Sequence, residues 1–544
     1  MKRFRKGPLL LLSALACASV LSMASCFPGA RSNRPRVIVL GIDGGTWKVA
    51  KPMMDAGQLP NLKKLYDGGL HGILESRPPI LSPVVWTTIF TGFGYTKHGV
   101  KDWSTSQSVN RRVNAIWEIL RDQKRKVDVF NVPATWPPDP IPGVMLSGFP
   151  LSGATYGGNT GELLTREQIE SGTVLALYRE SLPAIRAAAA KLAVGKWSPW
   201  LDAAVASRPT FRGVVRLYRL SDTDFYATPI YRTDSELRIS EPEGLRAEIE
   251  KKLGEPYIPE GPGWSRYAEE HVPEVLYQHL DQVFATQSKA ALEYAGRDWD
   301  LFLYVMTFVD RVSHPYWAYA NPEGYPGLDA AKAAKYRDAV ANAYRRSDEE
   351  LGRILAKAGG NPYVVIVSDH GFQSSVDTTK QIGTHNPDGI YLVSGPGIRP
   401  AEGQQHFIED VAPTLLYLLG MPVGQDMDGK AFPEVLDMVG RKLESVPSWE
   451  KTGRDATDKP VDTDTWESLK GLGYVDGAPP RGDAAGKGGA AGATPAAKDA
   501  TKDAAKDATG RAPAGSQPAP QGKAAEKSPF DDWPEPHHED QPNH

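Results

Sequence analysis

Three aspartates each follow a short apolar run that is typical of a buried strand. Asp43, Asp310 and Asp369 end the runs at residues 36–42, 301–309 and 363–368. Ligands of open α/β sheets lie outside the carboxyl ends of the strands, so we expect the three carboxylates to face one crevice. Three clustered carboxylates repel one another unless cations neutralise them.

Three histidines accompany these acids in the sequence. His314 lies four residues after Asp310, His370 directly follows Asp369, and His385 lies in a Gly-Thr-His motif. Carboxylates and imidazoles without thiolates suit Zn²⁺, and also Mn²⁺ or Fe. Six such ligands are too many for one tetrahedral ion. They suit two ions roughly 3.5–4 Å apart, as in two-metal phosphoryl-transfer sites.

The chain resembles the alkaline phosphatase superfamily in four motifs and their order: Asp43-Gly-Gly, Asp310-x-x-x-His314, Ser368-Asp369-His370-Gly-Phe and Gly383-x-His385. The resemblance is strongest to its type I phosphodiesterase and nucleotide pyrophosphatase branch, including bacterial predicted phosphohydrolases and phosphomutases. It covers about residues 35 to 435, apart from most of an insertion. It implies two metal sites, formed by Asp310, His314 and His385, and by Asp43, Asp369, His370 and a nucleophilic hydroxyl.

The hydroxyl must come from the segment that ends at Gly92, which contains Ser82, Thr87, Thr88 and Thr91. Counted back from Gly92, the nucleophile of the family falls at Ser82. Ser82 followed by proline fits a helix N-cap, where the positive end of the helix favours an alkoxide. Thr87 and Thr88 lie a turn inside, where a hydroxyl more often bonds a backbone carbonyl. They remain the alternative nucleophiles.

The resemblance implies a phosphohydrolase that cleaves phosphodiester bonds through a covalent phospho-serine. Nucleotide pyrophosphatases carry an Asn after a His-Gly pair, whereas this chain has Trp103 there. A phosphomonoesterase or a phospho-head-group transferase of the same superfamily is the alternative, although no arginine clamp typical of the monoesterases is visible. The alternative from another class is a non-catalytic, metal-bearing envelope binding protein.

A mostly parallel central sheet sandwiched by helices must position these motifs. We expect residues 36–150 and 291–440 to form this alkaline phosphatase-like core, and residues 151–290 to form an inserted cap or substrate region. Residues 330–358 read as one long helix. Residues 441–477 connect the core to a low-complexity tail, residues 478–544, whose composition predicts disorder.

The N-terminus predicts export. Residues 1–26 have a basic start, an apolar stretch too short for a comfortable membrane span, and small residues before Cys26, which resembles a bacterial lipidation site. We therefore expect residues 1–26 to be a signal peptide of the lipoprotein type, with membrane attachment by an N-terminal lipid in the bacterial envelope, facing the periplasm or cell surface. Ordinary signal cleavage or a retained anchor is the alternative. We expect residues 27–35 to be a linker. The only cysteines are Cys17 and Cys26, which excludes a thiolate metal site in the body. The net charge of -4 gives no nucleic-acid-binding signature.

Overall fold

The computed structural model describes residues 34–149, 154–156, 161–174, 178–205, 208–234, 237–259 and 273–450, and the single residues 466 and 470. The predicted signal segment with Cys26 and the predicted tail, residues 478–544, lie outside the described residues. Within the described part of the chain, no helix combines the length and the apolar character needed to cross a membrane.

A central sheet organises the fold, with the strand order β12-β4-β3-β13-β1-β14-β17-β2-β18, and with β19 also paired to β2. Its middle is parallel and consists of β4 (Gly143–Ser147), β3 (Val127–Val132), β13 (Leu301–Met306), β1 (Val37–Ile42) and β14 (Tyr363–Val367). Antiparallel pairing adds β17 (Asp388–Ser394), β2 (Leu70–Glu75) and β12 (Ser240–Glu241), and the short β18 (Ala401–Glu402) and β19 (His406–Phe407) pair parallel to β2. The mostly parallel sheet is confirmed.

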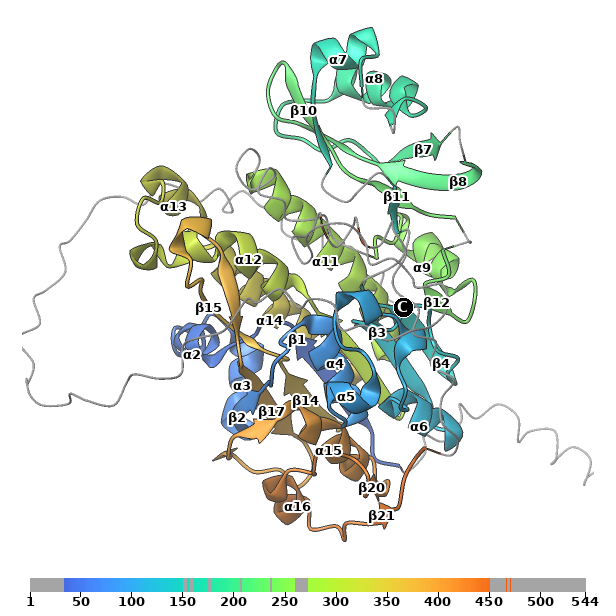
Figure 1. The fold of residues 1–544 in the computed structure, drawn as a ribbon, viewed down its shortest axis with the longest axis vertical. Helices are drawn as coiled ribbons and strands as arrows, with labels where there is room; N and C mark the ends of the chain where they lie inside the picture. Colours follow the sequence, from blue (N-terminus) through green and yellow to red (C-terminus); the bar gives the residue numbers. More distant parts are fainter. Residues whose placement is uncertain are drawn as a thin grey trace, which may run out of the picture.

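Helices cover both faces of this sheet, so its central strands are apolar throughout (Figure 1). In β1, Ile38 and Leu40 belong to one buried core and Val37 and Val39 to the other, because successive side chains point to opposite faces. The first core includes α2 (Trp47–Asp55), α3 (Pro60–Gly68), α11 (Pro273–Ala295), α12 (Phe308–Ala320), α13 (Ala330–Tyr336) and α14 (Ala339–Ala358). The second includes α4 (Ser82–Thr91), α6 (Ile116–Asp122), α15 (Val411–Leu418) and α16 (Pro433–Val439).

The inserted region contains a separate lobe of two small antiparallel sheets (Figure 1). One sheet has the order β6-β10-β9 (Glu162–Thr165, Asp224–Ala227, Leu217–Arg219), and the other has the order β5-β11-β8-β7 (Thr155–Tyr156, Ile230–Arg232, Arg208–Val215, Leu201–Val205). With α7 (Arg166–Ser171) and α8 (Leu182–Lys191), these strands enclose a core of their own. The chain returns to the central sheet through β12 and α9 (Leu245–Leu253).

Two predicted elements have different bounds in the structure. The strand predicted at residues 301–309 ends at Met306, and Asp310 lies in the first turn of α12. Both β13 and the start of α12 are buried, so the apolar run in the sequence continues from the strand into the helix. Hydrophobicity alone therefore does not show where the strand ends. The helix predicted at residues 330–358 is two helices, α13 and α14, that meet at Arg337 and Asp338.

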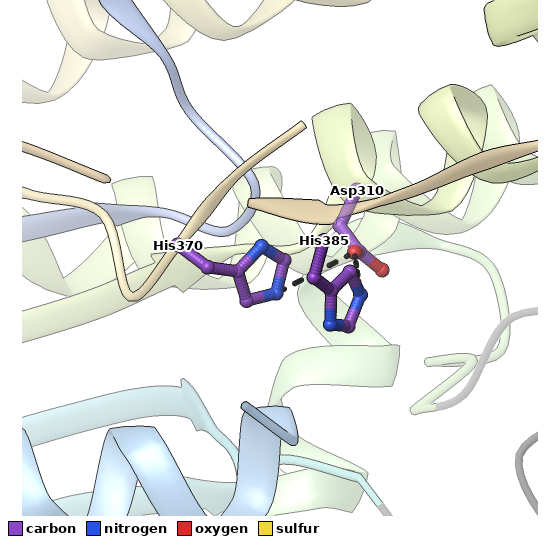
Figure 2. A group of neighbouring side chains, drawn as sticks. All are labelled: Asp310, His370 and His385. Carbon is purple, nitrogen blue, oxygen red and sulfur yellow. Dashed lines mark ion pairs between the residues drawn. The ribbon is translucent and has the colours of Figure 1, made fainter. Parts of the chain in front are cut away.

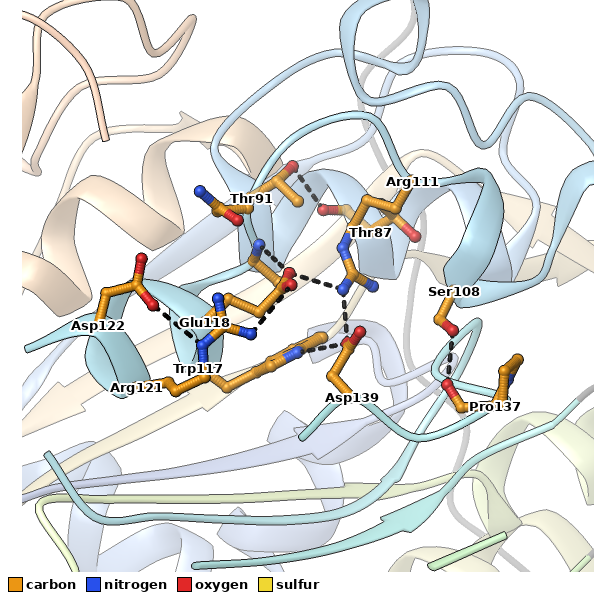
Figure 3. A network of polar contacts seen from close by, with 12 residues as sticks. Thr87, Thr91, Ser108, Arg111, Trp117, Glu118, Arg121, Asp122, Pro137 and Asp139 are labelled. Carbon is orange, nitrogen blue, oxygen red and sulfur yellow. Dashed lines mark hydrogen bonds and ion pairs between the residues drawn. The ribbon is translucent and has the colours of Figure 1, made fainter. Parts of the chain in front are cut away.

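A buried ion-pair network braces the loop that follows α4 (Figure 3). Arg111 Nη2 donates to Glu118 Oε2 at 2.7 Å and to Asp139 Oδ2 at 2.5 Å, and Trp117 Nε1 donates to the same Asp139 oxygen at 2.9 Å. A buried charge costs less when an opposite charge lies beside it, and Arg111 has two such partners. The network thus joins the loop, α6 and the segment between β3 and β4 on the α4 side of the sheet.

Candidate metal centre and nucleophile

The structure gathers the six predicted ligands at the carboxyl edge of the sheet. Asp43 directly follows β1, and Asp369 and His370 follow β14. Asp310 and His314 lie one turn apart on α12, and the adjacent hairpin of β15 (Gly371–Ser374) and β16 (Gly383–Asn386) carries His385. All six side chains are largely buried, and His385 is the most exposed at 14%. Segments far apart in the sequence therefore place three acids and three imidazoles in one site.

Two adjoining groups of ligand atoms meet at His370 Nε2. His370 Nε2 lies 3.4 Å from Asp369 Oδ2 and 3.5 Å from Asp43 Oδ1. It also lies 3.9 Å from Asp310 Oδ1, which is 3.5 Å from His385 Nε2 (Figure 2). Within each of the sets Asp43–Asp369–His370 and Asp310–His370–His385, the ligand atoms lie within 4.8 Å of one another.

His314 completes the second group. Its Nε2 lies 3.3 Å from Asp310 Oδ1 and 3.1 Å from His385 Nε2. The structure thus brings Asp310, His314 and His385 together, and Asp43, Asp369 and His370 together, with His370 Nε2 adjoining both groups. The family resemblance predicts one metal ion for each set, and this division stays a prediction.

Each histidine presents Nε2 to the carboxylates because its Nδ1 faces a backbone carbonyl. The Nδ1 atoms of His314, His370 and His385 lie 3.3, 3.1 and 3.0 Å from the carbonyl oxygens of Gly383, Gly371 and Ile80. A carbonyl only accepts, so Nδ1 carries the proton and the neutral ring has its lone pair on Nε2. The Nε2 atoms of His314 and His385 then face each other at 3.1 Å, an arrangement that a cation bound to both would satisfy.

The site also contains buried polar atoms that a cation would satisfy. Among the described residues, Asp43 Oδ1, Asp310 Oδ1, Asp369 Oδ2 and His370 Nε2 are buried without a hydrogen-bond partner. Buried polar atoms of this kind are rare in proteins unless water or an ion completes them. The donor set, oxygen and imidazole nitrogen, fits Zn²⁺ or Mn²⁺.

The pKa values of the three carboxylates shift in different directions. Burial raises the pKa of Asp43 to about 8, and the charge of Asp310 adds to this effect. Burial and the Asp43 charge raise the pKa of Asp369 well above its ordinary value. Burial acts on Asp310 as well, but His314 and His385 outweigh it and hold the pKa of Asp310 well below the usual range. Without a divalent cation, the site does not ionise all three acids together at neutral pH.

The raised pKa values predict that metal stabilises the protein more at high pH. Asp43 titrates near 3.8 when unfolded and near 8 when folded, so its contribution to stability is present below pH 4 and is lost as pH rises to 8. Bound metal reverses this loss because it favours the ionised form. We expect the difference in Tm between zinc-loaded and chelated protein to be larger at about pH 8.5 than at about pH 5.5.

The difference in Tm between zinc-loaded and chelated protein at one pH cancels the effect of groups that titrate in the same way in both forms. Asp128, buried in β3, is one such group, since burial raises its pKa to about 7 outside the ligand groups. An equal metal-induced Tm shift at both pH values would contradict the ligand roles of Asp43 and Asp369.

Ser82 is buried at the start of α4, between two contacts with the ligand groups. Two residues before it, the Ile80 carbonyl faces His385, and one turn after it, Trp86 Nε1 donates to Asp43 Oδ2 at 3.1 Å. The Ser82 hydroxyl makes no hydrogen bond to any residue that the structure describes. Among the hydroxyls of α4, that of Ser82 is therefore the one without a hydrogen-bond partner among the described residues.

The threonines of α4 are engaged in the helix, as predicted. Thr87 Oγ1 donates to the Pro83 carbonyl at 2.6 Å, and Thr91 Oγ1 donates to that of Thr87 at 2.7 Å. Thr88 Oγ1 donates to the Val84 carbonyl at 3.1 Å and lies 3.0 Å from His98 Nε2.

The predicted N-cap role of Ser82 is wrong. Leu81 is the N-cap, with extended backbone angles, and its carbonyl accepts from the backbone N–H groups of Val84 and Val85. Ser82 is the first helical residue, and Pro83 follows it in the first turn, where a missing N–H costs no helical hydrogen bond. The hydroxyl still lies at the positive end of the helix.

Trp86 and Gly44 also contact the acids, and sequence reasoning missed the part played by Trp86. Trp86 reaches Asp43 across Gly41, where an added Cβ would lie 2.5 Å from the indole. Gly44 has a φ of +73°, and its N–H donates to Asp369 Oδ1 at 3.3 Å. The spacing of Trp86 one turn after Ser82 is the signal that points to it. Gly44 brings backbone toward the acids, since its N–H bonds one of them.

The structure combines an α/β fold with two adjoining groups of candidate metal ligands at the carboxyl edge of a mostly parallel sheet. Residues 37–404 match the type I phosphodiesterase / nucleotide pyrophosphatase family. The chain belongs to this family.

Similarity to individual proteins is more local. The chain is 36% identical over 125 residues to the 2,3-bisphosphoglycerate-independent phosphoglycerate mutase of Dinoroseobacter shibae, which covers 21% of this chain and 22% of that one. The enzyme of the same name from Agrobacterium fabrum is 34% identical over 124 residues, with the same coverage. The matches thus span about a fifth of the length of these relatives.

The solved structures that match the chain are distant from it in sequence. A putative sulfatase from Bacteroides thetaiotaomicron is 10% identical, with a TM-score of 0.39 over 76% of this chain and 77% of that one. The phosphonate monoester hydrolase of Silicibacter pomeroyi is 14% identical, with a TM-score of 0.37 over 77% of this chain and 78% of that one.

Proposed function

We propose that this chain is a two-metal phosphohydrolase that cleaves phosphodiester bonds through a covalent intermediate on Ser82. The observation that carries the proposal is the convergence of two acid-and-histidine groups beside one buried hydroxyl that has no partner among the described residues. Family membership supports the phosphodiester as the bond that is cleaved. When bound, two divalent cations would neutralise the carboxylates and polarise the phosphoryl oxygens.

The residues of the chain divide the remaining work. Asp43, Asp369 and His370 would hold one cation, and Asp310, His314 and His385 would hold the other, with zinc favoured by the donor set. The backbone carbonyls of Ile80, Gly371 and Gly383 fix the tautomer of each imidazole, which directs Nε2 inward. Trp86 orients Asp43 by its hydrogen bond.

Ser82 is the nucleophile. Its Oγ forms a bond to phosphorus as the bond from phosphorus to the leaving alcohol breaks, and the serine proton reaches that alcohol by way of water. A second water then cleaves the Oγ–P bond, which releases a phosphomonoester and restores the hydroxyl. The start of a helix suits this step because the helix dipole favours the serine oxygen as an anion.

A substrate panel tests the proposal. We expect zinc- or manganese-loaded protein to hydrolyse bis-p-nitrophenyl phosphate faster than p-nitrophenyl phosphate, and p-nitrophenyl sulfate slowest. A preference for the monoester would contradict diester cleavage and favour a phosphomonoesterase. Absence of turnover on every substrate, with metal bound, would leave a metal-bearing binding protein as the function.

We also propose that the enzyme is exported and attached to a membrane by a lipid on Cys26, which places it in the bacterial envelope. The support is the basic and apolar N-terminus and the small residues before Cys26. We expect a Cys26→Ala variant expressed from its full-length gene to leave the membrane fraction while the wild type stays in it. Equal membrane association of both would contradict the lipid anchor.

A further inference from the structure

Arg311 is a buried cation next to the candidate metal centre. It directly follows Asp310 in the first turn of α12, and it is only 5% exposed. A guanidinium remains protonated in proteins, so its charge is carried into the interior. A buried charge of this kind is costly unless an opposite charge lies near it.

The side chain lines a cavity between the carboxyl ends of the sheet and the helices α11 and α12. Polar Asn131, Gln287 and Thr307 and the rings of Phe149 and Phe284 also line it. Of the described residues that line this cavity, Arg311 alone is charged. Both amides contact the protein itself, since Asn131 Nδ2 donates to the Val305 carbonyl at 2.9 Å and Gln287 Nε2 to that of Pro259 at 3.1 Å.

Aromatic rings hold the guanidinium in place. Arg311 Cζ lies 4.3 Å from the centre of the Phe149 ring, and that ring packs against Trp103 with 5.4 Å between centres. A cation over a ring face is attracted by the negative face of the ring, most strongly in a desolvated site. Such a contact uses the face of the guanidinium, while its N–H donors lie in the plane of the group, where they suit phosphate oxygens.

Arg311 also adjoins the metal site along the chain, because it lies between the candidate ligands Asp310 and His314 on α12. A phosphoryl group attacked by Ser82 carries its negative charge on oxygens that point away from the serine and the leaving alcohol. An arginine beside the ligand groups is the residue type that best matches these oxygens.

We propose that Arg311, held by Phe149 and Trp103, binds a non-bridging oxygen of the substrate's phosphoryl group. This inference rests on the proposed phosphohydrolase function and adds the substrate-binding residue to it. Sequence reasoning did not recognise Arg311 as a phosphate-binding arginine, because it occupies one of the unspecified positions of the Asp310-x-x-x-His314 motif. Trp103, which replaces the family's asparagine, supports the ring that carries the arginine.

The test compares Arg311→Gln with wild type in three measurements on zinc-loaded protein. We expect zinc stoichiometry to be unchanged and the calorimetric affinity for inorganic phosphate to fall roughly 10- to 100-fold. We expect kcat/KM for bis-p-nitrophenyl phosphate to fall by roughly 10²- to 10³-fold, the usual loss for one oxyanion donor. Arg353→Gln on α14, whose side chain is 43% exposed, is the matched control and leaves all three unchanged.

Two further variants keep the test decisive if Arg311→Gln folds poorly. Arg311→Lys keeps the charge but loses the planar donor pair, and we expect it to recover part of the phosphate affinity. Phe149→Leu keeps the arginine but removes the ring, and we expect weaker phosphate binding with zinc retained.

Each contrary result has one meaning. Wild-type phosphate affinity and turnover in Arg311→Gln, beside an inactive Ser82→Ala, would overturn the role of Arg311 and leave the proposed function intact. Loss of zinc from Arg311→Gln, Arg311→Lys and Phe149→Leu alike would make Arg311 a support of Asp310 and would also overturn the inference. Failure of the wild type to turn over any phosphate ester would instead remove the proposed function.

Discussion

Ser82→Ala is expected to abolish hydrolysis while leaving metal binding intact. Removing a nucleophile that acts with its activating groups lowers kcat by roughly 10³- to 10⁶-fold. Ser82 has no hydrogen bond to the described residues and packs at the end of α4, so replacing its hydroxyl with hydrogen leaves no protein group unpaired. Steady-state hydrolysis of bis-p-nitrophenyl phosphate, with zinc content measured on the same samples, checks this.

Two controls separate chemistry from folding. Ser347→Ala makes the same change in α14, where the buried hydroxyl donates to the Ala343 carbonyl at 2.9 Å, and we expect it to keep full activity. Thr87→Val removes the hydroxyl of an alternative nucleophile, and we expect this variant to stay active as well. Wild-type turnover by Ser82→Ala, together with loss in Thr87→Val or Thr88→Val, would move the nucleophile one turn along the helix.

Asp310→Asn is expected to lose metal as well as activity. Asp310 Oδ1 lies within 3.3 to 3.9 Å of Nε2 of His314, His385 and His370, so this one carboxylate adjoins both groups. The amide removes the charge that offsets the cation and places an N–H₂ group toward nitrogen lone pairs. We expect zinc affinity to fall by more than the roughly 10- to 100-fold typical of residues behind the ligands. Metal titration monitored by calorimetry measures it.

Asp128→Asn is the matched control for this change. Asp128 is buried in β3 and its Oδ1 accepts a hydrogen bond from the Val144 N–H at 3.1 Å, remote from the histidines in sequence and outside both ligand groups. We expect this variant to bind zinc as the wild type does. If Asp310→Asn kept two zinc ions with unchanged affinity, the assignment of Asp310 as a ligand would be wrong.

The sequence was sufficient to predict the sheet and the six residues that meet at its edge. Buried parallel strands are apolar runs, and acids at their carboxyl ends are brought together by topology. The antiparallel strands of the inserted lobe were not predicted. They are short, and their burial depends on pairing between distant segments, as in β5 with β11 and β8 with β11.

Two kinds of contact were also not predicted: those made by backbone atoms, and those between side chains far apart in the sequence. The carbonyls that fix the histidine tautomers come from Ile80, Gly371 and Gly383, and any residue type supplies a carbonyl. Arg311 was overlooked because its neighbours, Phe149 and Trp103, are more than 150 residues away in the chain. The start of α4 was misplaced by one residue, since Leu81 rather than Ser82 has the extended backbone of the cap.

Trapping the covalent intermediate tests the central claim most directly. Zinc-loaded wild-type protein is mixed with bis-p-nitrophenyl phosphate, quenched in acid during turnover, digested, and analysed by mass spectrometry of the peptide that contains α4. We predict one p-nitrophenyl-phosphoryl adduct on Ser82 and none in Ser82→Ala. An adduct on Thr87 or Thr88, or no adduct on this peptide while turnover is measured at a rate that the quench resolves, would contradict a serine nucleophile at the two-metal site.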